Sequence, residues 1–296
     1  MIEQIKDIVG ENNIQQNYSL KNCCSIKVGG NAKYFVTPES VDALFGLIDF
    51  LEKEGTRFRV IGNGTNIVFN DNGFNGVIIS TKKLDTIILY GEDGLLVSAG
   101  TMLSKVMNVS VDNNLSGLEF TAGIPGTVGG AIVMNAGASG FSVSDIVKNV
   151  TIYYNGDIKT IDTSECKFGY RTSRFLVDKS AVIIYAELKL KKELSNEKIK
   201  ETIKSNLLKR RATQPTEPSA GCVFKKCGDL PAGYLIDHAG LKGTAIGGAQ
   251  ISNVHANFIV NTGGASCENI KNLIELIETK IYDEYSLELQ KEIEII

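Results

Sequence analysis

The first 83 residues combine short apolar runs with one stretch of helical periodicity. Three runs have the length and composition of strands: 32–36, 57–62 and 76–80. Apolar positions recur at helical spacing between the first two runs: Val41, Leu44, Phe45, Ile48 and Leu51. Thr37 and Pro38 fit an N-cap and a first helical position, and Gly55 fits a helix end. This part is predicted to read strand, helix, strand, loop, strand.

Residues 84–192 are dominated by patterns typical of strands. Asn155 and Gly156 form a two-residue hairpin signal between two of them. One helix-like segment interrupts the series, from Met102 to about Asn113. The predicted strands are 86–90, 95–100, 149–154, 157–162 and 181–190.

The remaining third contains two helical patterns separated by irregular structure. We predict that Ser195 caps a polar helix with Ile199, Ile203 and Leu207 on one face. The stretch TQPTEPS holds two of the five prolines, so a boundary is placed near 205–218. A long amphipathic helix is predicted from Glu268 to about Tyr285, followed by a strand over roughly 287–296.

Composition and charge exclude several classes of protein. The 296 residues are 43% hydrophobic and 22% charged, which is typical of a globular protein. The net charge of -3 lacks the excess of positive charge that is typical of nucleic-acid-binding proteins. No signal peptide is indicated, and no apolar run is long enough to span a membrane. The six cysteines have neither a zinc-site spacing nor a secreted disulfide pattern, so no metal site is predicted. We expect a cytoplasmic protein with reduced thiols.

Two glycine-containing segments are candidates for binding chemistry. Gly62-Asn63-Gly64-Thr65-Asn66 follows a predicted strand, and such a loop can turn backbone N–H groups toward an anion. An ordinary turn is the alternative. Glycines also recur from Gly117 to Gly130 around Pro125, where the backbone could closely approach a pyrophosphate or a flat ring. No G-x-G-x-x-G spacing follows a strand and opens a helix, so this is not a dinucleotide fingerprint. A structural corner is the alternative.

Motifs along the whole chain resemble the UDP-N-acetylenolpyruvoylglucosamine reductase family. They are NCCSIKVGG, VIGNGTNIVFNDNGFNGVII, GLEFTAGIPGTVGGAIVMNAGA, FGYRTSRF, KRRATQPTEPSAGCVFK, AGYLIDHAGLKGTAIGGAQISNVHANFIVN and LELQKEIEII. The resemblance implies an α+β protein: a two-domain FAD-binding fold of the vanillyl-alcohol-oxidase (PCMH) type plus a C-terminal α+β substrate-binding domain. On this basis we predict FAD-binding subdomains at 1–83 and 84–205 and a substrate domain at 206–290. Strand 291–296 is placed either after it or back on the first subdomain.

The resemblance also implies a reaction. Such an enzyme uses NADPH to reduce UDP-N-acetylglucosamine enolpyruvate to UDP-N-acetylmuramate in peptidoglycan precursor synthesis, with FAD as cofactor and hydride leaving flavin N5. The partners expected are these two small molecules, with no nucleic acid and no membrane span, and a monomer is expected. Positions matching the family's FAD contacts are Gly62, Asn63, Gly64, Thr65, Asn66, Gly123, Ile124, Pro125, Gly126, Thr127, Gly129, Gly130, Asn135 and Ala136.

Three residues match catalytic positions of the family. The resemblance implies that Arg171 stabilises the substrate carboxylate and its enolate, that Cys222 donates the proton, and that Glu292 assists. Arg171 could instead be a surface ion pair, and Glu292 part of an exposed edge strand. The positions implied to bind substrate are Tyr170, Lys209, Arg210, Arg211, Lys225 and His255. For His255 a structural role is nearly as well supported, and His238 is taken as structural.

The chain departs from the family pattern near the proposed proton donor. Better-known members have serine where this chain has Cys222, and a thiol is the stronger acid. Cys227 could resolve an oxidised Cys222, although a plain loop residue is favoured. The segment 224–233 is short and resembles the family's shorter type, which lacks an extra loop. Two rival functions are a flavin oxidase on the same scaffold and a nucleotide-binding regulator without turnover.

Overall fold

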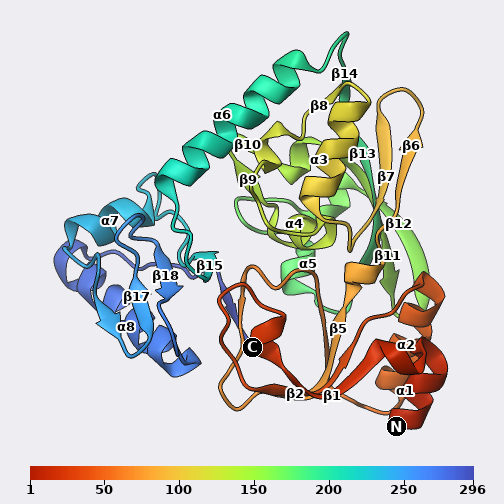
Figure 1. Ribbon diagram of the computed structural model, residues 1–296, viewed down its shortest axis with the longest axis horizontal. Helices are drawn as coiled ribbons and strands as arrows, with labels where there is room; N and C mark the ends of the chain where they lie inside the picture. The colour runs from red at the N-terminus through yellow and green to blue at the C-terminus, as the bar shows by residue number, and fades with distance from the viewer. The chain divides into compact units, whose positions relative to one another are not determined.

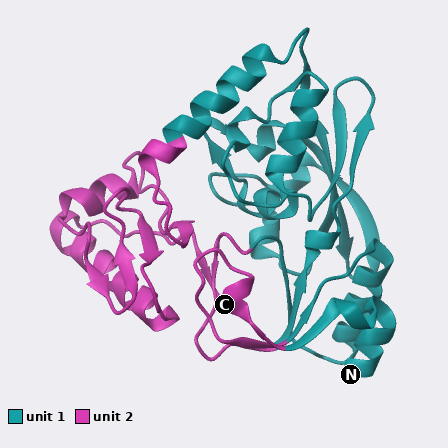
Figure 2. Ribbon diagram, viewed as in Figure 1, with its two compact units in different colours: residues 1–16, 34–63, 76–209 teal, residues 17–33, 64–75, 210–296 magenta.

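The computed structural model describes residues 1–296, which form two compact units, each built from separate stretches of the chain (Figures 1 and 2). Unit 1 comprises Met1–Gln16, Tyr34–Asn63 and Gly76–Lys209. Unit 2 comprises Asn17–Lys33, Gly64–Asn75 and Arg210–Ile296. The candidate loop 62–66 is therefore divided, with Gly62 and Asn63 in unit 1 and the rest in unit 2.

A five-stranded antiparallel sheet forms the centre of unit 1, in the order β12-β11-β13-β7-β6. Asn155 and Gly156 have positive φ values of 52° and 82°, as a tight hairpin turn requires, so the predicted hairpin is confirmed. All five strands were predicted, and each lies within a few residues of its predicted range. Their bounds are β6 Ile87–Tyr90, β7 Gly94–Ser98, β11 Val147–Tyr154, β12 Asp157–Asp162 and β13 Val182–Lys189.

Both faces of this sheet are buried because its strands present apolar side chains on each side. On one face Val150 and Ile152 join a core with α3 (Leu103–Asp112) and α4 (Val128–Met134). On the other face Tyr153 joins a second core with α1 (Ile2–Val9) and α2 (Val41–Lys53). Alternation along a strand sends neighbouring residues to opposite faces, which is why adjacent residues of β11 enter different cores.

A four-stranded sheet has the order β1-β2-β5-β3, with β3 and β5 parallel. The predicted strands 32–36, 57–62 and 76–80 are confirmed here. The helix α2 begins at Val41, so the predicted start at Thr37 and Pro38 is wrong: the Ser40 hydroxyl accepts the Ala43 N–H at 3.1 Å, while the Thr37 N–H bonds to Asn13. The bounds are β1 Ile14–Ser19, β2 Asn31–Val36, β3 Phe58–Ile61 and β5 Phe74–Ser80.

Unit 2 contains a four-stranded antiparallel sheet in the order β15-β18-β17-β16. The long helix α8 (Cys267–Tyr285) begins one residue before its predicted start, and the Ser266 hydroxyl caps it. The predicted strand 287–296 is too long: a strand forms only at β19 (Glu294–Ile295), which pairs in parallel with β4 (Ile67–Val68), while Lys291 makes an isolated bridge with Phe224. The other elements are β15 Ser219–Cys222, α7 Ala232–His238, β16 Ala245–Ile246, β17 Ala249–Ile251 and β18 Phe258–Asn261.

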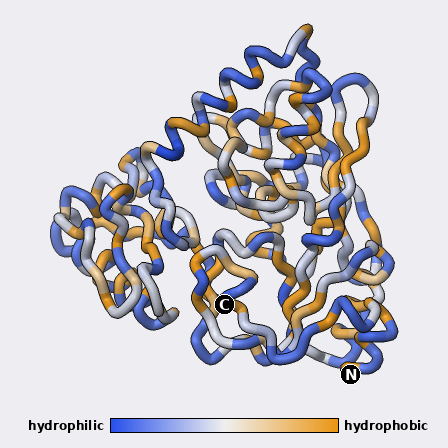
Figure 3. Tube along the Cα trace, viewed as in Figure 1, coloured by the Kyte–Doolittle hydropathy of each residue, from blue (hydrophilic) through white to orange (hydrophobic).

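Helix α6 (Glu197–Thr213) is largely hydrophilic along its length (Figure 3). Ile199 is buried, and Ile203 and Leu207 are partly buried against the core, so the predicted apolar face is confirmed. The predicted cap at Ser195 is wrong by one residue, because the carbonyl that accepts the Lys200 N–H belongs to Asn196. Shorter elements are β8 Leu115–Ser116, β9 Gly137–Ala138, β10 Phe141–Ser142, α5 Arg174–Val177 and β14 Lys191–Lys192.

Short 3-10 turns lie between these elements: Glu11–Asn13, Leu20–Asn22, Thr81–Lys83, Glu119–Thr121, Val143–Asp145 and Thr163–Cys166. None of the helices has the length and apolar content that crossing a bilayer would require. No cluster of three or more histidine, cysteine or acidic side chains is arranged to hold a metal ion.

Candidate active site

The first candidate loop and the glycine-rich stretch contact each other in unit 1. The Asn63 side-chain amide donates a hydrogen bond to the Pro125 carbonyl at 2.6 Å. A Cβ on Gly62 would lie 2.2 Å from the Thr127 hydroxyl oxygen, so only glycine fits at this approach. The structure therefore brings Gly62, Asn63, Pro125 and Thr127 together, although they are predicted from separate motifs.

The glycine-rich stretch ends by opening a short helix, α4, with Thr127 as N-cap. The N–H groups of its first turn are already used, since Val128 donates to Thr101, Gly129 to Ala99, and Gly130 to the Thr127 hydroxyl. Because those donors have protein partners, this helix end offers no open anion site. Contacts to a cofactor would come instead from the exposed backbone of the stretch.

Burial differs among the candidate cofactor residues of this stretch, with Ile124 and Gly126 partly buried. Gly123, Pro125 and Gly130 are exposed. Gly129 is buried, and a Cβ there would lie 2.8 Å from the Ala99 Cβ. Gly129 thus follows the structural-corner interpretation, whereas the exposed members leave main chain that a flat ring or a diphosphate could reach. An exposed edge built from glycine and proline fits a large planar cofactor because no side chain blocks its approach.

The other half of the first loop lies in unit 2 and is packed on backbone. A Cβ on Gly64, whose φ is 63°, would lie 2.0 Å from the Cys23 carbonyl oxygen. The Gly64 carbonyl accepts the Ser25 N–H at 3.0 Å. Thr65 and Asn66 are partly buried. The close backbone approach shows why the NCCSIKVGG and GNGTN segments both have small residues.

Arg171 lies in a tight turn of unit 1 with a left-handed backbone, φ 51°. Gly169 and Thr172 close this turn with reciprocal backbone hydrogen bonds of 3.1 and 3.3 Å. The guanidinium donates to the Gly137 carbonyl at 2.5 Å and to the Asn135 carbonyl at 3.4 Å. The residue is partly buried.

Asn135 and Ala136 are predicted cofactor contacts, but both take part in local backbone structure. Asn135 is buried, with 6% of its surface exposed, and ends α4 in the left-handed conformation. Its side-chain amide donates to the Gly169 carbonyl at 2.9 Å, and its side-chain oxygen accepts the Ser144 N–H at 3.0 Å. The Ala136 carbonyl accepts the Val143 N–H. The side chain of Asn135 is thus committed to the turn that carries Arg171.

Cys222 and Glu292 belong to unit 2, where the structure brings their segments together. Cys222 ends β15 and pairs with Phe258 of β18. The Glu292 N–H donates to the carbonyl of Val223, the residue after Cys222, at 2.8 Å. The Glu292 carbonyl accepts the Asn66 side-chain amide at 2.9 Å. Both candidate residues are partly buried, and Glu292 is not in the continuous edge strand that the alternative assumed.

His255 is held by its surroundings in a way that suits a structural role. Its Nδ1 accepts the Asn257 N–H at 3.2 Å, and its ring packs edge-on against Phe258 at 5.0 Å between centroids. Burial lowers the pKa of the imidazole, so the neutral form is favoured. His238, taken as structural from the sequence, contacts its own helix, with Nδ1 2.9 Å from the Tyr234 carbonyl.

The predicted substrate-binding cations are distributed over both units. Lys209 is an exposed residue of unit 1 at the end of its part of α6. Arg210, Arg211 and Lys225 belong to unit 2, and the Lys225 N–H donates to the Gln290 carbonyl at 2.8 Å. In unit 1 the ring of Tyr170, which is 50% exposed, lies 5.4 Å from the Arg171 guanidinium carbon. This distance is within the range of a cation–π contact.

All six cysteines are free thiols. Burial raises the pKa of Cys24, and it raises the pKa of Cys166 and Cys267 to about 11, so these thiols are poor nucleophiles. The Cys227 thiol lies 3.6 Å from the Glu288 carbonyl. Its role as a resolving thiol remains a hypothesis.

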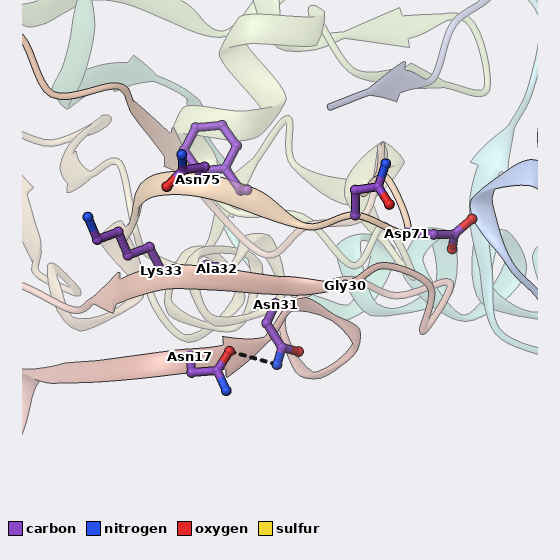
Figure 4. A pocket seen from close by; sticks show the side chains of 9 residues that line it. Asn17, Gly30, Asn31, Ala32, Lys33, Asp71 and Asn75 are labelled. Atoms are coloured by element: carbon purple, nitrogen blue, oxygen red, sulfur yellow. Dashed lines mark hydrogen bonds between the residues drawn. The ribbon is translucent and has the colours of Figure 1, made fainter.

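A polar pocket of about 530 Å³ lies in unit 2, and no predicted site residue lines it (Figure 4). The side chains of Asn17 and Asn31 join across it at 2.9 Å. Its lining is Asn17, Gly30, Asn31, Ala32, Lys33, Asp71, Asn72, Phe74 and Asn75. Since none of these residues belongs to the candidate site, the pocket is not where the proposed chemistry is expected.

Sequence reasoning missed a buried amide that positions the Cys222 segment. Asn257 is 6% exposed, and its side chain accepts the Phe224 N–H at 2.9 Å and donates to the Phe224 carbonyl at 2.8 Å. These two hydrogen bonds take the place of one pair of the backbone bonds that join neighbouring strands, next to β15. The asparagine lies within the HANFIVN motif, so the signal was present, but nothing local distinguished a buried amide from a ligand contact.

Two family models match the chain. The C-terminal domain model of UDP-N-acetylenolpyruvoylglucosamine reductase matches residues 214–296, and an FAD binding domain model matches residues 32–163. The chain is thus an α+β protein with an FAD-binding domain and the C-terminal domain of this reductase, which confirms the predicted fold class and cofactor.

Relatives and a solved structure match over nearly the full length. A UDP-N-acetylenolpyruvoylglucosamine reductase of Caldanaerobacter subterraneus subsp. tengcongensis is 38% identical, covering 100% of this chain and 98% of the relative. The Fervidobacterium nodosum reductase is 41% identical over 94% of this chain and 90% of that protein. The crystal structure of the Thermus caldophilus enzyme superposes with a TM-score of 0.80 at 33% identity, covering 95% and 97% of the two chains. The chain therefore belongs to the UDP-N-acetylenolpyruvoylglucosamine reductase family.

Proposed function

We propose that this protein reduces UDP-N-acetylglucosamine enolpyruvate to UDP-N-acetylmuramate with NADPH, as a step of peptidoglycan precursor synthesis. The observation that carries the proposal is 38% identity to a reductase of this name over the full chain, with Arg171, Cys222 and Glu292 all present. The net reaction adds one hydride and one proton across the enolpyruvyl double bond and oxidises NADPH to NADP⁺.

FAD would be held by the exposed backbone of the glycine-rich stretch and by the loop that contacts it. The contact of Asn63 with Pro125 and the exposure of Gly123 and Gly130 support this assignment. When bound, FAD accepts hydride from NADPH and supplies it to the terminal carbon of the enolpyruvyl group. The residues of the chain must then bind the carboxylate, stabilise developing charge and deliver a proton.

Arg171 is assigned to the substrate carboxylate. As hydride reaches the terminal carbon, negative charge develops on the adjacent carbon and its carboxylate, and a guanidinium binds such a group through parallel N–H donors. The bonds to Gly137 and Asn135 support the assignment because they fix the plane of the guanidinium before substrate arrives. Tyr170 and the cations Lys209, Arg210, Arg211 and Lys225 are assigned to the sugar-nucleotide part; His255 is kept as a weaker candidate.

Cys222 is assigned as proton donor to the charged carbon, with Glu292 assisting. A free thiol has a reference pKa near 8.5, so it can release a proton to a much more basic carbanionic carbon. The hydrogen bond from Glu292 to Val223 supports a joint role, because it couples the backbone of the two candidate residues. We place the reaction in the cytoplasm and expect a monomer. We also keep the assignment of 1–83 and 84–205 to FAD binding and 206–290 to substrate.

One experiment tests this function. Purified protein is examined for a flavin spectrum, and then NADPH oxidation is followed anaerobically with and without the enolpyruvyl substrate. Turnover that depends on this substrate supports the proposal. Protein that binds no FAD, or that turns over only with oxygen and an alcohol or sugar, refutes it.

The catalytic assignments need matched variants. Cys222→Ala should leave flavin reduction by NADPH intact and abolish product formation, while Cys227→Ala, the control, should retain both. A fully active Cys222→Ala enzyme would end the proton-donor assignment.

A further inference from the structure

The turn that carries Arg171 is docked on the end of helix α4, where Asn135 contributes both its buried side chain and its backbone carbonyl to the connection. Asn135 donates through its amide to the Gly169 carbonyl at one end of the turn, and its own carbonyl accepts the Arg171 guanidinium. Ser173, just after the turn, donates to the Val133 carbonyl at 2.7 Å. All these groups lie in unit 1.

The backbone of Asn135 is held as firmly as its side chain. Its φ and ψ of 43° and 56° are left-handed, and it ends α4 with the Ala136 N–H bonded to Ala131 at 2.8 Å. This 6→1 bond with a left-handed residue is the Schellman arrangement, where asparagine is second only to glycine. The side-chain oxygen of Asn135 accepts the Ser144 N–H. The nitrogen and the oxygen of the side-chain amide therefore each have a partner within the protein, and the residue is 6% exposed.

Arg171 needs such support because its own backbone is unfavourable. A non-glycine residue at φ 51° carries a conformational cost, and it persists only where surrounding contacts determine it. The guanidinium also bonds to the Gly137 carbonyl. Only glycine fits at this position, because a Cβ would lie 2.5 Å from the Phe141 carbonyl oxygen and 3.1 Å from the guanidinium. The strand β9 thus holds its carbonyl directly against the charged group.

We propose that Asn135 is a positioning residue for Arg171, and not a cofactor contact through its side chain. The inference rests on the proposed function, since it assumes that Arg171 meets the substrate carboxylate. Asn135 fixes the turn by bonding to Gly169 and fixes the guanidinium through its own carbonyl. The C-terminal end of α4 thereby sets the orientation of the Arg171 guanidinium, which is required when reduced flavin reduces the enolpyruvyl substrate.

The test compares Asn135→Gly with Asn155→Gly. Glycine accepts the left-handed backbone, so Asn135→Gly removes the side-chain bonds without adding strain. Asn155, with φ 52°, lies in the exposed hairpin and gives the same exchange away from the site. For Asn135→Gly we expect FAD affinity and anaerobic flavin reduction by NADPH within about twofold of wild type. Reoxidation of reduced flavin by the enolpyruvyl substrate should slow by about tenfold or more, because small misplacements of a positioning group are costly.

Two further readouts separate positioning from general damage. In an Arg171→Ala background, Asn135→Gly should add no further slowing, because the group it positions is gone. Backbone and Arg side-chain NMR relaxation should show the Arg171 Nε–H rigid in wild type and in Asn155→Gly, but mobile in Asn135→Gly. The NMR signal requires no turnover.

Three results would overturn the inference. One is weakened FAD binding in Asn135→Gly with unchanged reoxidation per bound flavin, which would make Asn135 a cofactor contact. Another is equal slowing in the presence and absence of Arg171. The third is an Arg171 side chain as rigid in Asn135→Gly as in wild type. An enzyme that fails to use the enolpyruvyl substrate at all would refute the proposed function, and the NMR comparison would still decide the positioning role.

Discussion

Adjacent glycines at the start of α4 should respond oppositely to the same substitution. Gly129 is buried, and the Cβ of Gly129→Ala would lie 2.8 Å from the Ala99 Cβ and 3.1 Å from the Ala99 carbonyl oxygen. Carbon atoms pack at about 3.5 to 4.0 Å, so α4 or the turn that follows β7 at Ala99 would have to move by roughly 0.7 Å. The movement also stretches the 2.8 Å bond from the Gly129 N–H to Ala99.

The net cost can be estimated from these contacts. Overpacking a core position costs about 1–3 kcal/mol, and replacing glycine by alanine within a helix returns about 0.5–1 kcal/mol. Gly129→Ala should therefore lower the free energy of unfolding by about 1 kcal/mol, within a range of roughly 0–2.5 kcal/mol. Gly130→Ala meets only the Thr127 hydroxyl at 3.4 Å, which is nearly ordinary contact, so it should be neutral or raise stability by about 0.5 kcal/mol.

Binding should show the reverse order. Gly130 is exposed on the surface assigned to FAD, so a methyl group there is expected to weaken FAD affinity by about tenfold, equivalent to roughly 1.4 kcal/mol. Gly129→Ala should lower FAD affinity less than Gly130→Ala does, although it lowers stability more. Unfolding is measured by urea titration of FAD-free protein, because bound ligand adds its own stabilisation, and affinity by flavin fluorescence titration.

Two results would contradict these expectations. If Gly129→Ala unfolds at the wild-type urea concentration, the close contact with Ala99 is not a real constraint. If Gly130→Ala binds FAD as tightly as wild type while Gly129→Ala does not, the exposed edge is not the cofactor surface.

Three further predictions follow from buried polar groups. Burial, and then the hydrogen bond to Asp49 of α2, raises the pKa of the Tyr153 hydroxyl above its ordinary value of 10. Its contribution to stability is therefore full below about pH 10 and is lost as the pH rises above that value. In urea unfolding measured as a function of pH, the wild type should lose stability above about pH 10 faster than Tyr153→Phe. Cys166 and Cys267, with pKa values raised to about 11, should resist iodoacetamide at pH 8 until the protein is unfolded, as peptide mass spectrometry would show; labelling of the native protein contradicts this. Asn257→Ala breaks both bonds to Phe224 and should lower the free energy of unfolding by about 2–4 kcal/mol, and a variant as stable as wild type would show that the buried amide is dispensable.

Much of the fold could be predicted because it depends on residues close together in the chain. The helix over Val41–Lys53 follows from apolar spacing, and the hairpin at Asn155 follows from turn chemistry, so both were found. Helix starts were less certain, since capping at Ser40 is decided by which oxygen reaches a free N–H. The final strand was predicted too long, because Gln290 and Glu292 take backbone partners in the 223–225 segment before the chain reaches β4.

The sequence by itself determined the family, the FAD-binding fold class and the identity of the candidate catalytic residues, because motifs and periodicity are local properties. Only the tertiary structure decided which glycine is buried and which faces outward, and that the Asn135 amide supports the Arg171 turn. It also joined Asn66 to Glu292, which lie 226 positions apart. Such contacts depend on how distant segments close on one another, and no short stretch of residues contains that information.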